Sequence, residues 1–440
     1  MLKHLRTSRP THRNPWTWLP LLYTAKGMPF AVLMTLSMFI YKRLSMDNAA
    51  IVWQTSFFLL PWIVKPLWRP YIDLYRTRRF WILLSEALIV IAVMGVARAV
   101  ETRMGLNTIT AFFWLLAIAA STHDTAVDGF YHLGIGSDRS IPMISVRRFF
   151  YRITFVWVQG IFVMVAGNLE VLTRSVASSW SMVVWTVAAV MALLFFFNAL
   201  FLPRPDDHPL RLGEISSARL RRMFRANLNT FLRKPHAKVA VAFMAVCMLT
   251  EGMTARVTPL FLIDKTSIGG LGLSPQEFGF AQGTVGVLAM VVGGLAGNLL
   301  IGRYGLKRLM LPMLALFTLP KAALLYLAYT MPDSLLPVSL CLLIEQGGVG
   351  IGMAACLMFM VYHARGDRAA AHYGIAVALM SFSLWLSGIC SGFLIDNFGY
   401  RTFYLVVMAT TPAVFLVTLF LNIPSSFGIT TQPSETDDRE

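Results

Sequence analysis

Charged side chains inside long apolar stretches are the groups in this sequence best placed to do chemistry. Asp124 and Asp128 lie four residues apart, so a helix would carry both carboxylates on one face. Lys26 and Arg152 lie in other apolar stretches at a similar expected depth. Two acids and two bases of this kind predict either a site for a proton or a charged ligand, or a fully paired network that only stabilises the fold.

A second group of charges lies in the C-terminal half of the chain. Glu251 is isolated in an apolar stretch, Arg256 follows it, and Glu345 belongs to a later stretch. Burying a charge among apolar side chains is costly, so packing alone does not explain Glu251 and we expect it to have a function. Glu86, by contrast, is expected to pair with Lys65 or with arginines in the loops.

The composition places these charges in a membrane. Of the 440 residues, 56% are hydrophobic and 14% are charged, the mean hydropathy is +0.63, and the apolar runs reach about 20 residues. The net charge of +16 does not indicate nucleic-acid binding, because the basic residues lie between the apolar runs and at their ends. The four cysteines lie within apolar runs without CxxC spacing, so they are expected to pack rather than to bind metal.

Twelve apolar runs are long enough to span a membrane, and a hydrophilic stretch separates the sixth from the seventh. The sequence therefore predicts an all-α membrane protein of two six-helix halves. The predicted spans are 16–44, 49–68, 80–100, 108–133, 145–167, 177–202, 237–263, 276–301, 309–330, 335–363, 370–394 and 402–423. The predicted parts are an N-terminal half 1–202, a basic cytoplasmic linker 203–236, a C-terminal half 237–423 and a disordered cytoplasmic tail 424–440.

Lysine and arginine are distributed unevenly over the loops, which predicts the orientation. If the N-terminus is cytoplasmic, the basic N-terminal segment, the linker and the most arginine-rich loops all lie on the cytoplasmic side. Both termini are therefore expected in the cytoplasm. Residues 215–232 of the linker interleave arginine with apolar residues, so they form either an amphipathic helix on the anionic membrane surface or a plain tether.

Two similar loops follow the second and the eighth span. The first holds Asp73 with Arg76, Arg78 and Arg79, and the second, 302–308, has glycine in place of the acid. Both resemble the loop motif G-x-x-x-D-R-x-G-R-R of the major facilitator superfamily. An acid near a helix N-terminus that pairs with arginines would act as a cytoplasmic latch and hold neighbouring spans in one conformation.

Glycine and proline interrupt two of the spans. Gly27 and Pro29 are expected to break the first span, and Gly347 and Gly348 belong to a glycine-rich run in the tenth. Small residues allow close packing and breaks allow bending, so these positions are candidates for packing or for gating. The sequence has no P-loop, nucleophile elbow or zinc-ligand spacing, so we expect no enzyme, no metal site and no cofactor.

Segments in both halves resemble the AmpG family of the major facilitator superfamily, whose members import anhydro-muropeptides across the bacterial inner membrane. The family has serine at position 26, so Lys26 is a departure from it. The segments are KGMPF at 26–30, KPLWRPYID at 65–73, ASTHDTAVD at 120–128, YR at 151–152, EGM at 251–253, EQGGVGIGMAA at 345–355 and FGYRTFY at 398–404.

The resemblance implies a proton-coupled importer of amino-sugar peptides in the bacterial inner membrane, a monomer driven by the proton gradient, with a small-molecule substrate and no nucleic-acid partner. The candidate binding residues are Asp124, Asp128 and Glu251 for the proton, Lys26, Arg152 and Arg256 for substrate carboxylates, Tyr151 and Glu345 beside them, and Tyr23, Trp114 and Tyr131 for stacking on sugars.

Two alternative functions stay open. One is a carrier of another amphiphilic metabolite, such as a siderophore-like compound or an acyl-CoA, and the other is a sensor or scaffold that does not transport. Acids that are all in closed ion pairs, with no central cavity, would favour the scaffold.

Overall fold

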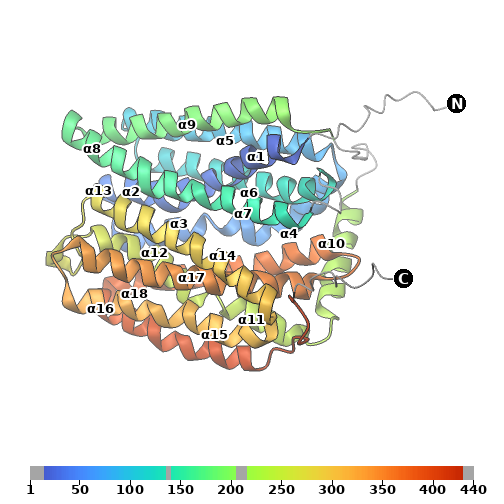
Figure 1. The fold of residues 1–440 in the computed structure, drawn as a ribbon. Coiled ribbons are helices and arrows are strands. Elements are labelled where there is room, and N and C mark those ends of the chain that lie inside the picture. The colour runs from blue at the N-terminus through green and yellow to red at the C-terminus, as the bar shows by residue number, and fades with distance from the viewer. Residues whose placement is uncertain (1–13, 135–139, 205–215, 430–440) are drawn as a thin grey trace, which may run out of the picture.

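The computed structural model describes residues 14–134, 140–204 and 216–429, which form a bundle of long helices (Figure 1). Eleven helices in this described part are long and apolar enough to cross a membrane. The last, α18 (Ala369–Leu419), has 51 residues and would be about 75 Å long if straight, more than twice the thickness of a bilayer core. It turns at Gly399, where φ is 70°, and so supplies two spans. The predicted all-α architecture with twelve spans is therefore confirmed.

The spans of the first half run from α1 to α9. They are α1–η1–α2 (Pro15–Ala31, Val32–Leu36, Ser37–Arg43), α3–α4 (Asn48–Phe57, Leu60–Leu74), α5 (Arg78–Glu101), α6 (Leu106–Gly134), α7–η3–α8 (Ser140–Phe155, Val156–Phe162, Val163–Thr173) and α9 (Val176–Phe201). The spans of the second half end with α18. The others are α11–α12 (Ala237–Val246, Leu249–Ile263), α13–η6–α14 (Pro275–Phe278, Gly279–Gly286, Val287–Tyr304), α15–η7–α16 (Leu306–Thr318, Leu319–Lys321, Ala322–Thr330) and α17 (Leu335–Ala364).

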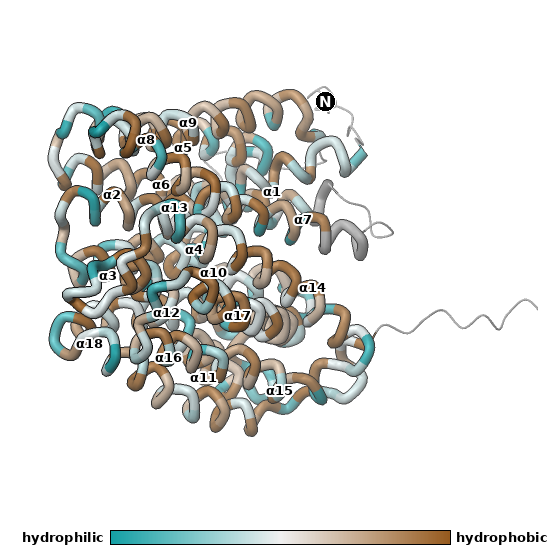
Figure 2. Tube along the Cα trace, turned by 60° about the vertical axis from the view of Figure 1, so that its left-hand side comes forward, coloured by the Kyte–Doolittle hydropathy of each residue, from teal (hydrophilic) through white to brown (hydrophobic). Residues whose placement is uncertain are grey.

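The two halves lie side by side, with α1–α9 above and α11–α18 below in Figure 1. Figure 2 shows hydrophobic residues along the lengths of the helices and hydrophilic residues mainly in the turns at the two ends. Large apolar side chains such as Leu299, Val171 and Leu419 are exposed on the outer surface, as expected for helices that face lipid. Such a surface is stable only inside a bilayer, which agrees with the membrane location predicted from composition.

The first span is not broken, contrary to the expectation for Gly27 and Pro29. The helix continues through Pro29 into a π-helical segment, Val32–Leu36, and then to Arg43. The missing N–H of Pro29 leaves the carbonyl of Ala25 without its helical partner, but the helix continues and widens into the π segment three residues later. Gly27 instead allows close packing, because a Cβ there would lie 2.5 Å from the hydroxyl of Thr154.

The glycine run of the tenth span also lies in an uninterrupted helix, α17. A Cβ at Gly348 would lie 2.0 Å from the carbonyl oxygen of Leu316, so this glycine lets α17 and α15 approach closely. A Cβ at Gly347 would meet no atom closer than 4.0 Å, the carbonyl oxygen of Ala289. The two neighbouring glycines therefore differ in what they do for packing.

The linker contains a helix, α10 (Ser217–Leu232), that contacts α4 of the first half and α11 and α18 of the second. Ser216 caps it, and Phe231 buries its ring against the imidazole of His363 at 4.9 Å. Residues 205–215 lie outside the described part. We call the end of the bundle that carries α10 the α10 end, and the opposite end the far end (Figure 1). Exposed arginines on or directly after α10 are Arg219, Arg221, Arg222, Arg225 and Arg233.

The described part of the predicted tail, 424–429, forms a turn against the second half. Phe427 is buried, and its carbonyl oxygen accepts a hydrogen bond of 2.9 Å from the N–H of Leu306. The guanidinium of Arg365 lies 4.1 Å from the centre of the Phe427 ring. The rest of the tail expected to be disordered, 430–440, and the basic N-terminal segment, 1–13, lie outside the described residues.

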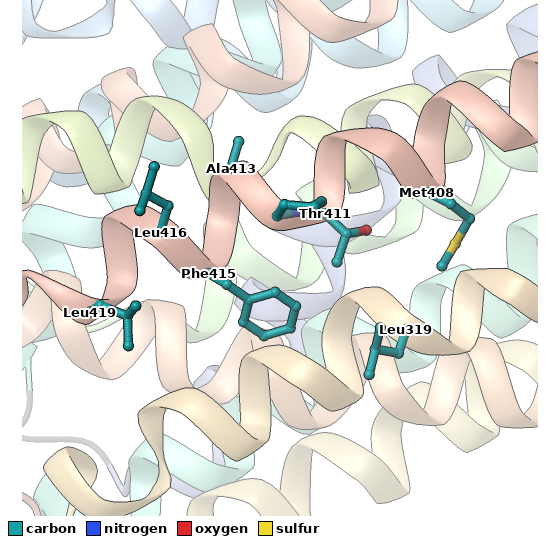
Figure 3. Close-up of a pocket in the computed structure, with 8 residues that line it drawn as sticks. Leu319, Met408, Thr411, Ala413, Phe415, Leu416 and Leu419 are labelled. Atoms are coloured by element: carbon teal, nitrogen blue, oxygen red, sulfur yellow. The ribbon is translucent and has the colours of Figure 1, made fainter.

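One cavity of about 620 Å³ lies on the outer surface between η7 and the second part of α18 (Figure 3). Its lining is almost entirely apolar, and Leu319, Leu416 and Leu419 are exposed on the same surface. A groove of this kind on a surface that faces lipid is where acyl chains pack. It carries none of the charged residues discussed above, so it is not the candidate functional site.

Candidate functional site

Four charged side chains from α1, α4 and α6 form one cluster inside the first half; we call it the N-terminal cluster. The Lys26 ammonium lies 2.8 Å from Asp124 Oδ1 and 2.5 Å from Asp128 Oδ1. Lys65 pairs with Asp124 Oδ2 and lies 3.2 Å from Asp128 Oδ2. The aspartates share a helical face, as their spacing predicted, and each contacts both lysines. Two acids and two bases balance each other in charge.

The partners of two predicted residues differ from the expectation. Lys65 belongs to the N-terminal cluster and not to Glu86, while Arg152 lies outside the cluster. Glu86 instead accepts hydrogen bonds from Asn198 at 2.7 Å and pairs with His123 at 3.1 Å. His123 precedes Asp124 and so points about 100° away from it, toward α5 and α9. The Glu86 and His123 side chains are at most 1% exposed, as in a closed structural network.

A second cluster joins α12, η7 and α17 inside the second half; we call it the C-terminal cluster. The Lys321 ammonium lies 2.8 Å from Glu251 Oε2 and 2.9 Å from Glu345 Oε1, and it donates to Thr254 Oγ1 at 3.0 Å. Gln346 donates to the other oxygen of Glu345 at 2.7 Å. The sequence had suggested that Glu251 is isolated, but it is paired with Lys321. One lysine serves two acids, so the cluster has one negative charge in excess.

The pairing of Lys65 with Glu86 that the sequence predicted was wrong, and no role was predicted for Lys321. Lys65 lies within the KPLWRPYID segment. Its position in an apolar span was the sequence feature that could have indicated a buried acidic partner. Lys321 follows Pro320, and the short 3₁₀ segment Leu319–Lys321 orients it inward. Both lysines are 1% exposed or less. A buried ammonium implies a carboxylate within reach, but only the packing of helices decides which one.

Arg152 and Arg256 lie at the interface between the halves. Arg152 contacts Met290 of α14, and Arg256 contacts Met34 of η1. Both arginines lie within electrostatic reach of Glu251. The structure thus brings the arginines and Glu251 toward one region.

Tyr151 lies beside the N-terminal cluster, within electrostatic reach of Asp124 and of its neighbour Arg152. Its ring packs on Phe155 with the ring centres 5.8 Å apart. Of the predicted stacking residues, Tyr23 is near this cluster, with its ring 5.5 Å from the Lys26 ammonium. Tyr131 meets Tyr23 edge to face, whereas Trp114 packs on Phe58 in the hydrophobic core.

Two stripes of partly exposed residues face this region from α1 and α12. Lys26, Phe30 and Met34 follow one another at intervals of four on the first span, whose other residues between them are buried. Glu251 and Ala255 form a similar stripe on α12. Met34 contacts Arg256 across the interface, so the stripe on the first span faces the partner half at this point.

Asp264, in the loop after α12, joins the halves at the far end. It is 1% exposed, it pairs with Lys42 of α2, and it accepts hydrogen bonds of 2.5 Å from Asn48 and from Tyr400. Asn48 and Lys42 belong to the first half, so this set, the far-end latch, closes the far end. Asp264 has no recognisable signal in the sequence, because its partners are distant in the chain.

Of the three arginines expected to pair with Asp73 after the second span, Arg78 forms an ion pair with it. Asp73 lies 3.2 Å from Arg78 and 3.5 Å from Arg69. Arg76 stacks at 5.6 Å from the rings of Tyr75 and Phe80. Arg79 donates a hydrogen bond of 2.5 Å to the carbonyl oxygen of Ala199. In the similar loop after the eighth span, 302–308, Arg303 and Arg308 lie over the ring of Tyr304 at 5.4 and 5.8 Å.

No family model matches the chain. It is 23% identical over 365 residues to the anhydromuropeptide permease of Escherichia coli K12, covering 81% of this chain and 70% of that protein. It is 22% identical over 418 residues to the putative transporter AmpG 4 of Rickettsia felis, covering 91% of this chain and 95% of that one. A POT family transporter solved with a thioalcohol-conjugated peptide superposes with a TM-score of 0.70 at 12% identity, over 91% of this chain and 94% of that one. The chain is therefore similar in sequence to AmpG-type permeases, and it shares the fold of solved membrane transporters.

Proposed function

We propose that this protein is a proton-coupled importer of anhydro-muropeptides, the amino-sugar peptides released from peptidoglycan, in the bacterial inner membrane. Two observations support the proposal. The chain is similar to a protein named anhydromuropeptide permease along four fifths of its length. It also holds buried charges at the interface of two halves, where transporters of this fold type place their sites. The proposal includes a monomer with both termini in the cytoplasm and no cofactor.

The C-terminal cluster carries the proposal of proton coupling. Glu251 and Glu345 share the single ammonium of Lys321, and among the described residues neither forms an ion pair with a second base. Two acids that share one base in a low-dielectric interior favour the uptake of one proton. The N-terminal cluster is balanced, because each aspartate contacts two lysines. We therefore assign the transported proton to Glu251 and Glu345, in preference to Asp124 and Asp128.

One alternative is a sensor or scaffold that does not transport, and the pairing of every acid in the two clusters favours it. Exposure distinguishes these pairs from purely structural ones. The side chains of Glu251, Asp124 and Asp128 are 15%, 17% and 23% exposed. The Glu86–His123 pair is at most 1% exposed. Acids that stay partly exposed can exchange protons and meet a ligand, whereas a fully buried pair cannot, so we prefer transport.

The other alternative is a carrier of a different amphiphilic metabolite. Lys26 supports keeping it as a candidate, because together with Lys65 it neutralises the two aspartates, whereas the AmpG family has serine at position 26. A neutral cluster binds a different set of ligands from an acidic one. Uptake of siderophore-like compounds or acyl-CoA in the same assay tests this candidate directly.

The deciding experiment is uptake by the purified protein in proteoliposomes. Labelled anhydro-muropeptide should accumulate when the outside is acidic relative to the lumen, and a protonophore should abolish accumulation. Liposomes that carry the Glu251→Gln variant provide the matched control for coupling. Absence of uptake under an inward proton gradient, with the protein folded, would refute the proposed substrate.

A further inference from the structure

Arg152 and Arg256 are guanidinium groups on opposite halves, and each reaches across the interface to a methionine of the other half. Arg152 Nη1 of α7 lies 2.6 Å from Met290 Sδ of α14. Arg256 Nη1 of α12 lies 2.7 Å from Met34 Sδ of η1. The two contacts therefore cross the same interface in opposite directions.

Neither guanidinium has a carboxylate oxygen within 4.0 Å among residues 14–134, 140–204 and 216–429. All three lysines of the two clusters do have such partners. Arg256 is only 7% exposed. A thioether sulfur is a weak acceptor, and each guanidinium has five N–H donors, so most of its hydrogen-bonding capacity is unused and its charge has no directly paired counter-ion. A cation held in this way inside a membrane protein indicates a site for an anion.

Glu251 does not supply that anion. It lies within electrostatic reach of both arginines, but its Oε2 atom is bonded to Lys321 at 2.8 Å. A guanidinium presents N–H groups in a planar fork that matches the two oxygens of a carboxylate or phosphate. The missing partner is therefore an oxyanion that arrives with the ligand.

We propose that Arg152 and Arg256 together bind one oxyanion of the transported ligand, a carboxylate or a phosphate, which displaces the methionine sulfurs and bridges the two halves. This proposal extends the proposed function. It rests on that function for one point only, namely that the site lies on a transport pathway. It implies that ligands need an accessible oxyanion and that neutral sugars are excluded. The same anion contacts both halves, so its binding couples their relative positions.

Binding to the full-length protein in detergent micelles tests this site, with four probes measured by tryptophan fluorescence or calorimetry. N-acetylmuramic acid carries a carboxylate, its methyl ester lacks the charge, N-acetylglucosamine is neutral, and N-acetylglucosamine 6-phosphate carries a phosphate. The acid should bind at least about tenfold more tightly than its ester, because charge-assisted hydrogen bonds are lost in the ester. Tighter binding of the phosphate than of the acid would identify a phosphate as the preferred oxyanion.

Substitution of the arginines supplies the second arm. Arg152→Gln and Arg256→Gln should each weaken binding of the acid at least about tenfold and leave the weak binding of the ester unchanged. Lysine at either position should restore part of the affinity. The effects of Arg152→Gln and Arg256→Gln should be coupled in the double variant, as expected for one bridging anion. Met34→Leu and Met290→Leu should stay within about twofold of the parent protein.

Folding does not confound this test. Loss of a cation that lacks a counter-ion is neutral or stabilising, so neither glutamine variant should lower the unfolding temperature. Arg98→Gln, an exposed arginine paired with Glu101, is the matched control for loss of charge. Absence of binding by both anionic probes, or affinities that the glutamine variants leave unchanged, overturns the proposal. Failure of anhydro-muropeptide uptake with arginine-dependent anion binding intact would instead refute the proposed substrate alone.

Discussion

The ammonium of Lys321 lies 2.8 Å from the carboxylate of Glu251 and holds it close to a second acid, Glu345. One base thus serves two acids in the second half, while two bases serve two acids in the first. This difference in charge balance underlies the proposal that the transported proton binds in the second half. It also makes the two clusters respond differently to substitution.

Replacement of Lys321 by methionine should destabilise the protein strongly. The change keeps the volume but leaves Glu251 and Glu345 without their shared base, and breaking a buried ion pair typically costs about 3–5 kcal/mol. Thermal unfolding of the purified protein measures the effect. Adding Glu345→Gln to the Lys321→Met variant should recover part of the stability, because one buried charge is removed. An unchanged unfolding temperature in Lys321→Met would show that the ion pairs contribute little.

Glu251→Gln should uncouple transport from the proton gradient. The glutamine keeps the hydrogen bond to Lys321 but cannot bind a proton, so exchange of labelled for unlabelled substrate should continue while accumulation against a gradient disappears. Proteoliposome uptake and counterflow measured side by side distinguish the two activities. Glu86→Gln, in the sealed network, is the control and should keep the pH dependence. Gradient-driven accumulation in Glu251→Gln would exclude Glu251 as the coupling acid.

Loss of the far-end latch should open the far end. Asp264→Asn removes the charge that Lys42 and the hydrogen bonds of Asn48 and Tyr400 hold in place. A cysteine introduced at Ala255, on the exposed stripe of α12, should then react faster with an impermeant maleimide added from the far side. The four native cysteines are first replaced by serine for this assay.

Arg43→Gln is the matched control for the latch. Arg43 pairs at 3.0 Å with Glu170, also in the first half, so this ion pair does not join the halves. Its loss should leave the labelling rate at Ala255→Cys unchanged. Equal labelling of the Asp264→Asn variant and the parent protein would mean that the latch does not control opening.

Two adjacent glycines of α17 should respond in opposite ways to alanine. Gly348→Ala places a methyl group 2.0 Å from the Leu316 carbonyl oxygen and should destabilise the fold by about 1–3 kcal/mol. Gly347→Ala places it in open space and should be neutral or slightly stabilising, because alanine favours the helix. Thermal unfolding of the two variants provides the comparison. Equal losses would contradict the close approach of α15 and α17.

The basic face of α10 should make stability depend on anionic lipid. Its exposed arginines lie on a helix that touches both halves, and each contributes up to about 1 kcal/mol of attraction to an anionic surface. The protein should unfold at a higher temperature in nanodiscs with phosphatidylglycerol than with phosphatidylcholine alone. Glutamine at Arg221, Arg222 and Arg225 should remove this difference, whereas glutamine at Arg98 and Arg103 should not.

Much of the fold was predictable because hydropathy and helical periodicity are local properties of a sequence. The twelve spans, the linker between the halves and the shared face of Asp124 and Asp128 all follow from runs and spacings of nearby residues. The break expected at Pro29 was wrong, because the helix continues through the proline into a π segment three residues later. Local rules predict that a helix is perturbed, but the surrounding packing determines how.

Apolar runs in the sequence show which charged residues are buried and on which spans they lie. Their partners depend on how the helices pack: Lys65 and not Arg152 with the aspartates, Lys321 with Glu251 and Glu345, and His123 with Glu86. The energy of an ion pair depends on a distance of a few ångströms, and here that distance is between helices that are far apart in the chain. The same reason left Asp264 unnoticed, since Lys42 and Tyr400 reach it only after the halves have packed together.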